Sequence, residues 1–338
     1  MINNMYKGIL VYAEYLNNNV HGVTFELLNK SRELADKLNE KVYSVIIGNN
    51  LSAHAEELIY HGADVVYVYD SPHFRLPDII IHKRILVDLI NEIKPRLILI
   101  GATLWGRSLA PRIAAALKTG LTADCIDIEL NENNDIIQIR PAFTGNIIAH
   151  IRTLRKPIMA TVRYKVFSPA TRDTSRKGEI IKKDIKQEYL KPTGIKVLKV
   201  TEKKGPKLTE AQIVVGVGKG LKSPEDIRIF KELAKLLGGV IGVSRPIVDN
   251  GWVSREYQVG FSGNIIKPKV YIACGISGSP QHLAGIRDSK IIIAINIDPS
   301  APIFKYADYG IVGDMYEVVP KLIKYLKMKK NSPSTGDV

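Results

Sequence analysis

Cysteine is almost missing from this chain of 338 residues, in which only Cys125 and Cys274 occur. The two lie far apart, neither belongs to a Cys-x-x-Cys motif, and no histidines cluster beside them. A zinc or iron–sulfur site formed by this chain alone is therefore not expected. Free cysteine is commonly buried, so we expect both residues to be small apolar members of the core.

Long apolar runs are missing too. The longest, such as residues 97–100 and 291–295, are as long as β-strands, whereas a membrane span needs roughly 18 consecutive apolar residues. Residues 1–7 contain no apolar signal region, and a strand pattern follows almost at once. We therefore expect a cytoplasmic protein that is not itself in the membrane.

Acidic residues are too few to balance the basic ones. The chain has 48 Lys and Arg against 34 Asp and Glu, a net charge of +14. Such a charge can indicate nucleic-acid binding. Here, however, lysines are spread over predicted helix faces, and no run interleaves arginine with aromatic residues as a base-stacking surface would. We expect solvated faces or an acidic protein partner, and no nucleic acid.

The first part of the chain alternates short apolar strands with amphipathic helices. Strand patterns cover residues 9–15, 42–47, 65–69 and 97–100, and helical patterns cover residues 24–38, 55–59, 78–93 and 106–117. Such alternation predicts a mostly parallel sheet with helices on both faces. We expect a doubly wound α/β domain.

A second alternating set follows a stretch rich in turn residues and charge, residues 167–208. Strand patterns cover residues 213–217, 240–243, 270–274, 291–295 and 310–312, and helical patterns cover residues 224–237 and 315–326. The fold class expected is thus α/β, with two doubly wound parallel-sheet domains. Placing the boundary near Gly205-Pro206 gives domains 1–205 and 206–330, with a polar tail at 331–338.

Small, hydroxyl and cationic residues follow the strands of the second set. They are Gly218-Lys219-Gly220, Ser244-Arg245, the run from Gly275 to His282, and Asn296. Ligands of open α/β sheets bind where strands end, and a dinucleotide fits glycines, helix starts and cations. Taken singly, residues 216–220 are equally compatible with a tight turn, and His282 with a half-buried structural side chain. The prediction of a ligand site rests on their convergence.

The run from Val270 to Ile286, VYIACGISGSPQHLAGI, closely resembles the signature of electron-transfer flavoprotein alpha subunits. The resemblance covers nearly the whole chain. Further matching segments are residues 106–112, 119–125, 140–143, 159–163, 220–223, 244–246, 258–260, 289, 294–296, 298–304 and 307–310.

The resemblance implies that the second domain is a Rossmann-like domain with one FAD. Lys219 and Ser244 would meet the phosphates, and Val259, Gly260, Phe261 and Ser262 would run past the isoalloxazine ring. Its pyrimidine side and ribityl chain would be wrapped by Ser277, Gly278, Ser279, Pro280, Gln281 and His282. The adenosine end would be held by Asn296, Asp314 and Met315.

Arg245 and His282 are expected to share one crevice with the flavin ring. An arginine keeps its proton and a histidine can donate a hydrogen bond, so both would stabilise an anionic flavin semiquinone. Three residues depart from the family's usual pattern. Lys219 replaces an arginine, Phe261 replaces a polar residue, and Pro280 replaces an aliphatic one.

By resemblance, the chain is an electron carrier and not an enzyme. It would accept electrons from flavin dehydrogenases, such as acyl-CoA dehydrogenases, and pass them to a membrane quinone oxidoreductase or another acceptor. The first domain would pack on a beta subunit that carries AMP or, in bifurcating members, a second FAD.

Two alternatives stay open. One is a subunit of a bifurcating, NADH-oxidising flavoprotein, a question on which this chain is nearly silent. The other is an adenine-nucleotide-binding enzyme, because the first domain resembles adenine-nucleotide α/β folds. Such an enzyme needs a glycine-rich phosphate loop after an early strand, and residues 12–15, Tyr-Ala-Glu-Tyr, offer none.

Overall fold

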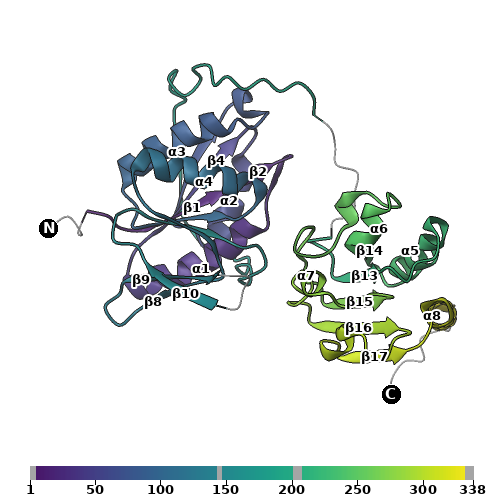
Figure 1. Ribbon diagram of the computed structural model, residues 1–338. Helices are drawn as coiled ribbons and strands as arrows, with labels where there is room; N and C mark the ends of the chain where they lie inside the picture. The colour runs from purple at the N-terminus through teal and green to yellow at the C-terminus, as the bar shows by residue number, and fades with distance from the viewer. Residues whose placement is uncertain (1–4, 143–146, 201–207, 332–338) are drawn as a thin grey trace. The chain divides into compact units, whose positions relative to one another are not determined.

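A computed structural model describes residues 5–142, 147–200 and 208–331. The chain divides into two compact units, Met1–Leu198 and Lys199–Val338 (Figure 1). The boundary expected at Gly205-Pro206 lies outside the described residues. Of the tail expected at 331–338, only Asn331 is described, as the last residue of a helix.

The first unit is built on a seven-stranded sheet in which every neighbouring pair is parallel. Its order is β12 (Glu179–Lys182), β5 (Val65–Asp70), β4 (Val42–Gly48), β1 (Ile9–Ala13), β6 (Leu97–Gly101), β11 (Ile158–Val162) and β7 (Leu121–Cys125). β1 and β6 are buried along their whole length. That burial explains why their sequences are continuous apolar runs and not alternating ones.

Helices cover both faces of this sheet. α1 (Val23–Leu38) and α2 (Ser52–Tyr60) pack on one face, and α3 (Ile79–Ile93) and α4 (Leu104–Leu117) on the other. Successive strand residues point to opposite faces, so Ile9 and Val11 join the first core while Leu10 and Tyr12 join the second. The predicted parallel α/β domain is confirmed.

Residues 121–182 form strands that the sequence did not predict. Besides β7, β11 and β12, they contain a three-stranded antiparallel sheet of β8 (Asp127–Leu130), β9 (Ile136–Ala142) and β10 (Ile147–Arg152). The strand expected at residues 9–15 stops at Ala13. A small hairpin, β2 (Tyr15–Leu16) with β3 (Asn19–Val20), follows it.

The second unit contains a five-stranded parallel sheet. Its order is β14 (Val240–Val243), β13 (Ile213–Val217), β15 (Val270–Cys274), β16 (Ile291–Asn296) and β17 (Tyr309–Val312). The five predicted strands are all present. Free Cys125 and Cys274 are both buried, as predicted.

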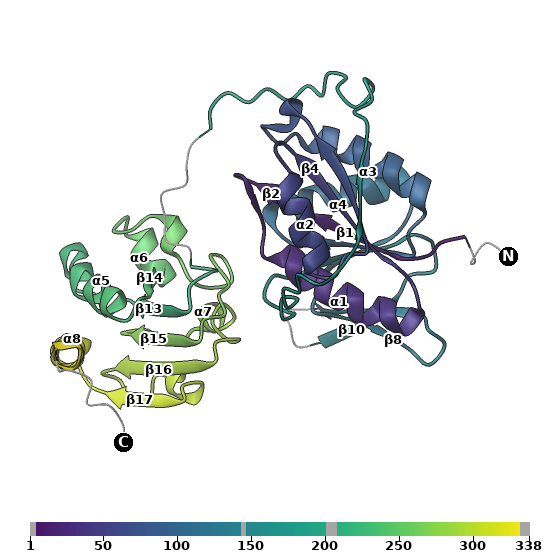
Figure 2. The ribbon, with the colours of Figure 1, turned by 180° about the vertical axis from the view of Figure 1, so that it is seen from behind.

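Long helices cover only one of the two faces of the second sheet (Figures 1 and 2). There α5 (Ile227–Leu236) and α8 (Met315–Asn331) pack through Phe230, Leu233 and Val319. Loop residues such as Ile266 and Ile303 and the short helix α7 (Pro280–Leu283) cover the other face. A doubly wound sheet has long helices on both faces. In this domain the second face is covered instead by residues 257–268 and 276–290, which form loops and the short helix α7, so the expected arrangement is incomplete.

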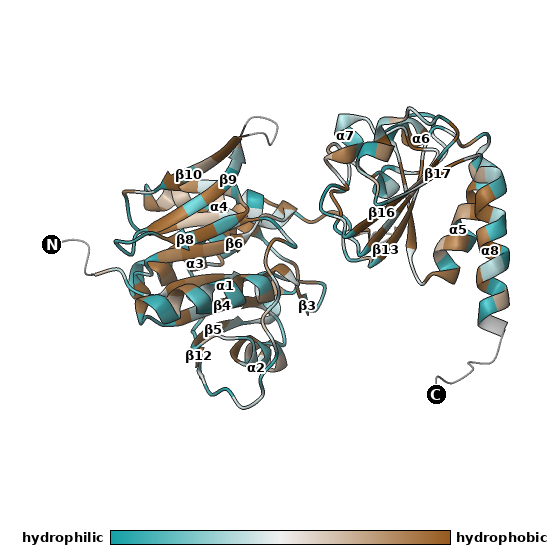
Figure 3. Ribbon diagram, turned by 90° about the horizontal axis from the view of Figure 1, so that it is seen from below, coloured by the Kyte–Doolittle hydropathy of each residue, from teal (hydrophilic) through white to brown (hydrophobic). Residues whose placement is uncertain are grey.

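Hydropathy follows this packing. The strands of the second sheet are hydrophobic, whereas α8 carries hydrophobic and hydrophilic residues on different sides (Figure 3). No helix in residues 5–142, 147–200 and 208–331 has both the length and the apolar character that crossing a membrane requires.

Candidate functional site

The strand order of the second sheet locates the site. Numbered along the chain, the order is 2-1-3-4-5, so the direction of the connections reverses between β13 and β15. Ligands of open parallel sheets bind outside the carboxyl ends of the strands at such a reversal.

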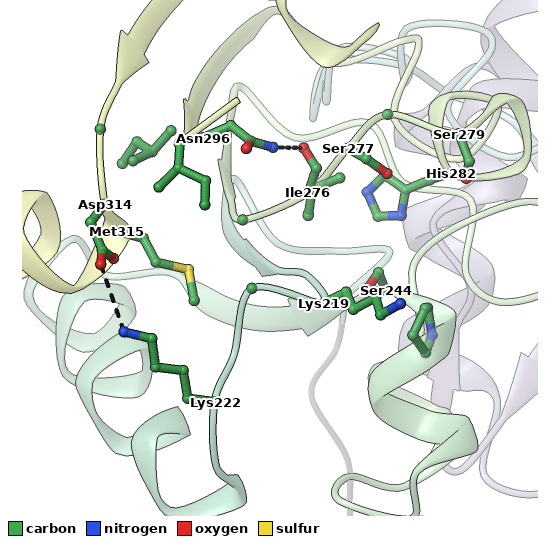
Figure 4. Close-up of a pocket in the computed structure, with 17 residues that line it drawn as sticks. Lys219, Lys222, Ser244, Ile276, Ser277, Ser279, His282, Asn296, Asp314 and Met315 are labelled. Atoms are coloured by element: carbon green, nitrogen blue, oxygen red, sulfur yellow. Dashed lines mark hydrogen bonds and ion pairs between the residues drawn. The ribbon is translucent and has the colours of Figure 1, made fainter. Parts of the chain in front are cut away.

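A cavity of about 540 Å³ lies at this edge and is lined from the ends of all five strands (Figure 4). Its lining consists of Lys219, Gly220 and Lys222 after β13; Ser244 and Pro246 after β14; Gly275, Ile276, Ser277, Gly278, Ser279 and His282 after β15; Ile295, Asn296 and Ile297 around the end of β16; and Gly313, Asp314 and Met315 after β17.

Glycines let the loops around the cavity touch one another. A Cβ on Gly218 would lie 2.2 Å from the carbonyl oxygen of Gly275, and one on Gly275 would lie 2.8 Å from the Met315 sulfur. Gly275 also has a φ of +62°, which side chains rarely adopt. The loops after β13, β15 and β17 therefore close on each other, and these two glycines serve that contact.

Two lysines bring positive charge to the cavity. Lys222 lies with its ammonium 3.7 Å from an Asp314 carboxylate oxygen and 4.6 Å from the centroid of the Tyr316 ring. Lys219 has no ion pair within the described part of the chain. An unpaired ammonium at the mouth of a cavity is suited to an anionic group such as a phosphate.

Two buried polar atoms in the lining lack a hydrogen-bond partner among the described residues. They are the Ser244 hydroxyl oxygen and Nδ1 of His282. Burial lowers the pKa of His282 to about 4, although the nearby Val259 carbonyl acts in the opposite direction. That carbonyl lies outside hydrogen-bonding geometry for Nδ1. Buried polar groups are nearly always satisfied, so two such atoms at one cavity indicate that a ligand supplies their partners.

The polar side chains that line the cavity at the end of β16 and after β17 are held in place by hydrogen bonds. Asn296 donates from Nδ2 to the Ile276 carbonyl at 2.9 Å and accepts from the Asp298 N–H at 3.0 Å. Asp314 accepts from the Tyr316 N–H at 2.8 Å. Met315 is buried. The Asn296 and Asp314 side chains are therefore preorganised and keep spare hydrogen-bonding capacity.

Arg245 lies outside the cavity lining. It is the first residue of α6 (Arg245–Asp249), and its Nε lies 3.2 Å from the Asp249 carboxylate one turn later. Its side chain is 70% exposed. The structure therefore brings His282 to the cavity and does not bring Arg245 there, because α6 directs that side chain to its own next turn.

The segment Val259–Ser262 lies beside α7, not in the lining. The Phe261 N–H donates to the Gln281 carbonyl at 2.8 Å, and the Ser262 hydroxyl accepts from Gln258 Nε2 at 2.9 Å. Phe261 is 69% exposed. Phe261, Ser262, Pro280 and Gln281 are exposed next to the residues that line the cavity, whereas Val259 and Gly260 are buried. Together these six residues form a shelf beside the cavity.

The sequence reasoning missed Lys222 as a site residue. The available signal was a second cation three residues after Lys219 in the same strand–helix turn. In the described ranges there is no group of three or more His, Cys, Asp or Glu side chains that could hold a metal ion.

Known proteins match this chain along most of its length. Residues 9–188 match the electron transfer flavoprotein domain, and residues 207–287 match the electron transfer flavoprotein FAD-binding domain. The chain is 46% identical to an electron transfer flavoprotein subunit alpha of Thermoanaerobacterium thermosaccharolyticum, over 97% of this chain and 100% of that one.

Two further relatives have more specific names. The chain is 44% identical to subunit LctC of lactate dehydrogenase (NAD(+),ferredoxin) of Acetobacterium woodii, over 99% of this chain and 80% of that one. It is 38% identical to the acryloyl-CoA reductase electron transfer subunit beta of Anaerotignum propionicum, over 97% and 98%.

A solved structure of a thiamine diphosphate-dependent 4-hydroxybenzoylformate decarboxylase from Rhodococcus jostii is a distant match. The identity is 14%, over 93% of this chain and 56% of that one, and the TM-score is 0.23. A likeness this low supports no inference. The family matches do: this chain belongs to the alpha subunits of electron transfer flavoproteins, whose second domain binds FAD and which pair with a beta subunit.

Proposed function

We propose that this chain is the FAD-carrying subunit of a heterodimer that transfers electrons and performs no turnover chemistry of its own. The observation that carries the proposal is the cavity at the β13–β15 reversal, where the buried Ser244 hydroxyl and His282 Nδ1 lack partners in the described residues. FAD bound there would supply the redox chemistry, and the protein would bind it and set its potential.

The lining divides into groups that suit different parts of FAD. Lys219 and Lys222 would offset the charge of the pyrophosphate, and Ser244 and His282 would donate hydrogen bonds. Asn296, Asp314 and Met315 would hold the adenosine end. We further propose that Arg245 and the shelf of Val259, Gly260, Phe261, Ser262, Pro280 and Gln281 complete the site beside the isoalloxazine ring.

The partners are proposed from the family. The first unit would pack on the beta subunit, which would carry AMP. Electrons would come from flavin dehydrogenases such as acyl-CoA dehydrogenases and leave to a membrane quinone oxidoreductase or another acceptor. The net charge of +14 favours acidic docking surfaces on those proteins.

A bifurcating complex is the second candidate. It is favoured by the 44% identity to a subunit of a lactate dehydrogenase whose name includes both NAD(+) and ferredoxin. In that case the beta subunit would hold a second FAD in place of AMP. Counting flavins and AMP in the purified heterodimer separates the two candidates.

The central experiment is to purify the chain with its beta subunit and to quantify FAD. One FAD per alpha subunit is expected, and Lys219→Ala should weaken FAD binding about tenfold by removing a charged contact. Lys324→Ala, on the exposed side of α8, should leave it unchanged. A colourless heterodimer that takes up no FAD would contradict the proposal.

A further inference from the structure

Two buried histidines each pair with a tyrosine hydroxyl, but through different ring nitrogens. Nδ1 of His82 lies 2.9 Å from the Tyr12 hydroxyl, and Nε2 of His282 lies 2.9 Å from the Tyr271 hydroxyl. Burial lowers the pKa of both imidazoles to about 4. Each ring is therefore neutral at physiological pH and carries one N–H, on one nitrogen or the other.

The pair in the first unit shows how the position of the proton is decided. Trp105 can only donate, and its Nε1–H lies 2.9 Å from the Tyr12 oxygen. Because that oxygen accepts from Trp105, the buried Tyr12 proton is satisfied by donating to His82 Nδ1. His82 then carries its own proton on Nε2.

The same reasoning gives His282 the opposite tautomer. Tyr271 is fully buried, and burial raises its pKa well above the ordinary value, so it keeps its proton. Within the described ranges, the only hydrogen-bond partner of its hydroxyl is Nε2 of His282. A buried donor left unsatisfied costs about 1–3 kcal/mol. Tyr271 therefore donates to Nε2, and the single imidazole proton lies on Nδ1.

Gly216 makes room for this hydroxyl. A Cβ at Gly216, on neighbouring strand β13, would lie 2.0 Å from the Tyr271 oxygen. Tyr271 itself lies on β15 and His282 on α7, so the hydrogen bond links the sheet to the loop that borders the cavity. Any larger residue at position 216 would displace the phenol from His282.

We propose that Tyr271 is a positioning residue that fixes His282 as the Nδ1–H tautomer, so that the imidazole presents a donor to a carbonyl oxygen of the bound flavin. Nδ1 is buried and makes no hydrogen bond to a described residue, the nearby Val259 carbonyl included, and His282 lines the cavity. A neutral ring with the proton on Nδ1 can donate from that atom but cannot accept there. The inference rests on the proposed binding of FAD and adds the proton arrangement that the site requires.

The first test reads the tautomer directly. The full chain, labelled with nitrogen-15 in histidine and purified with its beta subunit, is studied by NMR of the ring nitrogens, assigned by loss of signals in His282→Asn. We expect His282 to be protonated on Nδ1 and bare on Nε2, with His82 the reverse as an internal reference. A proton on Nε2 of His282 would overturn the proposal. Because this measurement does not depend on FAD uptake, a failure of FAD binding would count against the proposed function alone.

The second test removes the hydroxyl. Tyr271→Phe should allow the Nε2–H form of His282 to become populated and should weaken FAD binding about five- to tenfold, the loss of one hydrogen bond. Tyr12→Phe, the matched change at the other pair, should leave FAD binding unchanged. If Tyr271→Phe alters neither the tautomer nor the affinity, or alters only one of them, the proposal is wrong.

A pair of amide variants keeps the test decisive even if Tyr271→Phe folds poorly. The amide nitrogen of Asn lies near the position of Nδ1, and that of Gln near Nε2. We expect His282→Asn to bind FAD at least threefold more tightly than His282→Gln, because it keeps the hydrogen-bond donor in place. The reverse order would show that the flavin meets the other nitrogen.

Discussion

The Lys222 ammonium lies 3.7 Å from the Asp314 carboxylate and thereby links the loop after β13 to the loop after β17 across one end of the cavity (Figure 4). The two side chains are 69% and 39% exposed, so the pair stabilises the fold little. Lys222→Ala should leave the free energy of unfolding within about 0.5 kcal/mol of the original. It should nevertheless weaken FAD binding several-fold, because it removes a positive charge from the lining. FAD titration at low and high salt measures this effect, and Lys321→Ala on α8 is the control. Equal affinities for both variants would exclude Lys222 from the site.

Arg245 gives a prediction about the redox potential. Its exposed pair with Asp249, one helical turn apart, is worth only about 0.3–0.5 kcal/mol and can be exchanged for a better partner. If the guanidinium turns towards the flavin, it favours the reduced and more negative form. We expect Arg245→Ala to lower the reduction potential of bound FAD in a redox titration. Arg228→Ala, which removes an exposed arginine of α5, should not change it. An unchanged potential in Arg245→Ala would place the cation away from the ring.

Removing the Ser244 hydroxyl should leave the stability of the flavin-free protein intact but weaken its binding of FAD. Its hydroxyl oxygen is buried and has no partner in the described residues. Ser244→Ala should therefore leave the flavin-free protein equally stable or slightly more stable, and weaken FAD binding by about 1 kcal/mol. Ser31 in α1 is the matched control, since its buried hydroxyl also lacks a described partner. Ser31→Ala should leave FAD affinity unchanged. Melting temperatures measured with and without FAD report both effects. If flavin-free Ser244→Ala is less stable than the original protein, the hydroxyl stabilises the fold itself and is not reserved for the ligand.

The sequence predicts three strands of the second sheet well because they are almost entirely buried, whereas β17 is exposed. These three, β13, β14 and β15, have the predicted bounds, since largely buried parallel strands are continuous apolar runs. By contrast, β10 is largely exposed and has no such run. β11 lies between β6 and β7, and that pairing depends on strands distant in sequence. Local pattern alone cannot supply it.

The site was predictable as far as one rule applies, namely that ligands of open α/β sheets bind beyond the carboxyl ends of the strands. That rule brings Lys219, Ser244, His282 and Asn296 to one edge, and the structure places all four in the cavity lining. Asp314 and Met315 came from the family resemblance, because no local pattern marks them. The pairing of Tyr271 with His282 depends on a contact between a strand and a loop helix, which neither residue reveals in the sequence.

Gly278 should tolerate no side chain. Its φ is +86°, and a Cβ there would lie 2.5 Å from the backbone nitrogen of Ile303. That nitrogen donates to the Ser277 carbonyl at 3.0 Å, so a clash would also break this link. Gly278→Ala should cost about 2 kcal/mol or more and reduce FAD binding. At Gly238, φ is +68° with nothing within 4 Å of an added Cβ, so Gly238→Ala should cost only about 1 kcal/mol. Urea unfolding compares the two, and equal losses would mean that steric contact with Ile303 is unimportant.

Glu14 makes the first unit less stable at high pH. This carboxyl follows β1, is only 2% exposed, and accepts a hydrogen bond from the Thr103 hydroxyl at 2.5 Å. Burial raises its pKa from 4.5 to about 7, although the Thr103 hydrogen bond acts in the opposite direction. Since the folded state binds the proton more tightly than the unfolded state, its stabilising contribution is complete below pH 4.5 and is lost as the pH rises through 7.

Glu14→Gln stays neutral at every pH and keeps an acceptor for Thr103. We therefore expect the variant to be more stable than the original by about 1–3 kcal/mol at pH 8 and to lose this advantage at pH 5. Glu33 provides the contrast, because its pairs with Lys30 and Lys37 lower its pKa against the effect of burial. Glu33→Gln should lose a little stability at neutral pH and none in acid. Melting temperatures of Glu14→Gln and the original protein, measured from pH 5 to 8, test this prediction. If the two curves run parallel, Glu14 is ionised in the folded protein throughout this range, and burial does not raise its pKa.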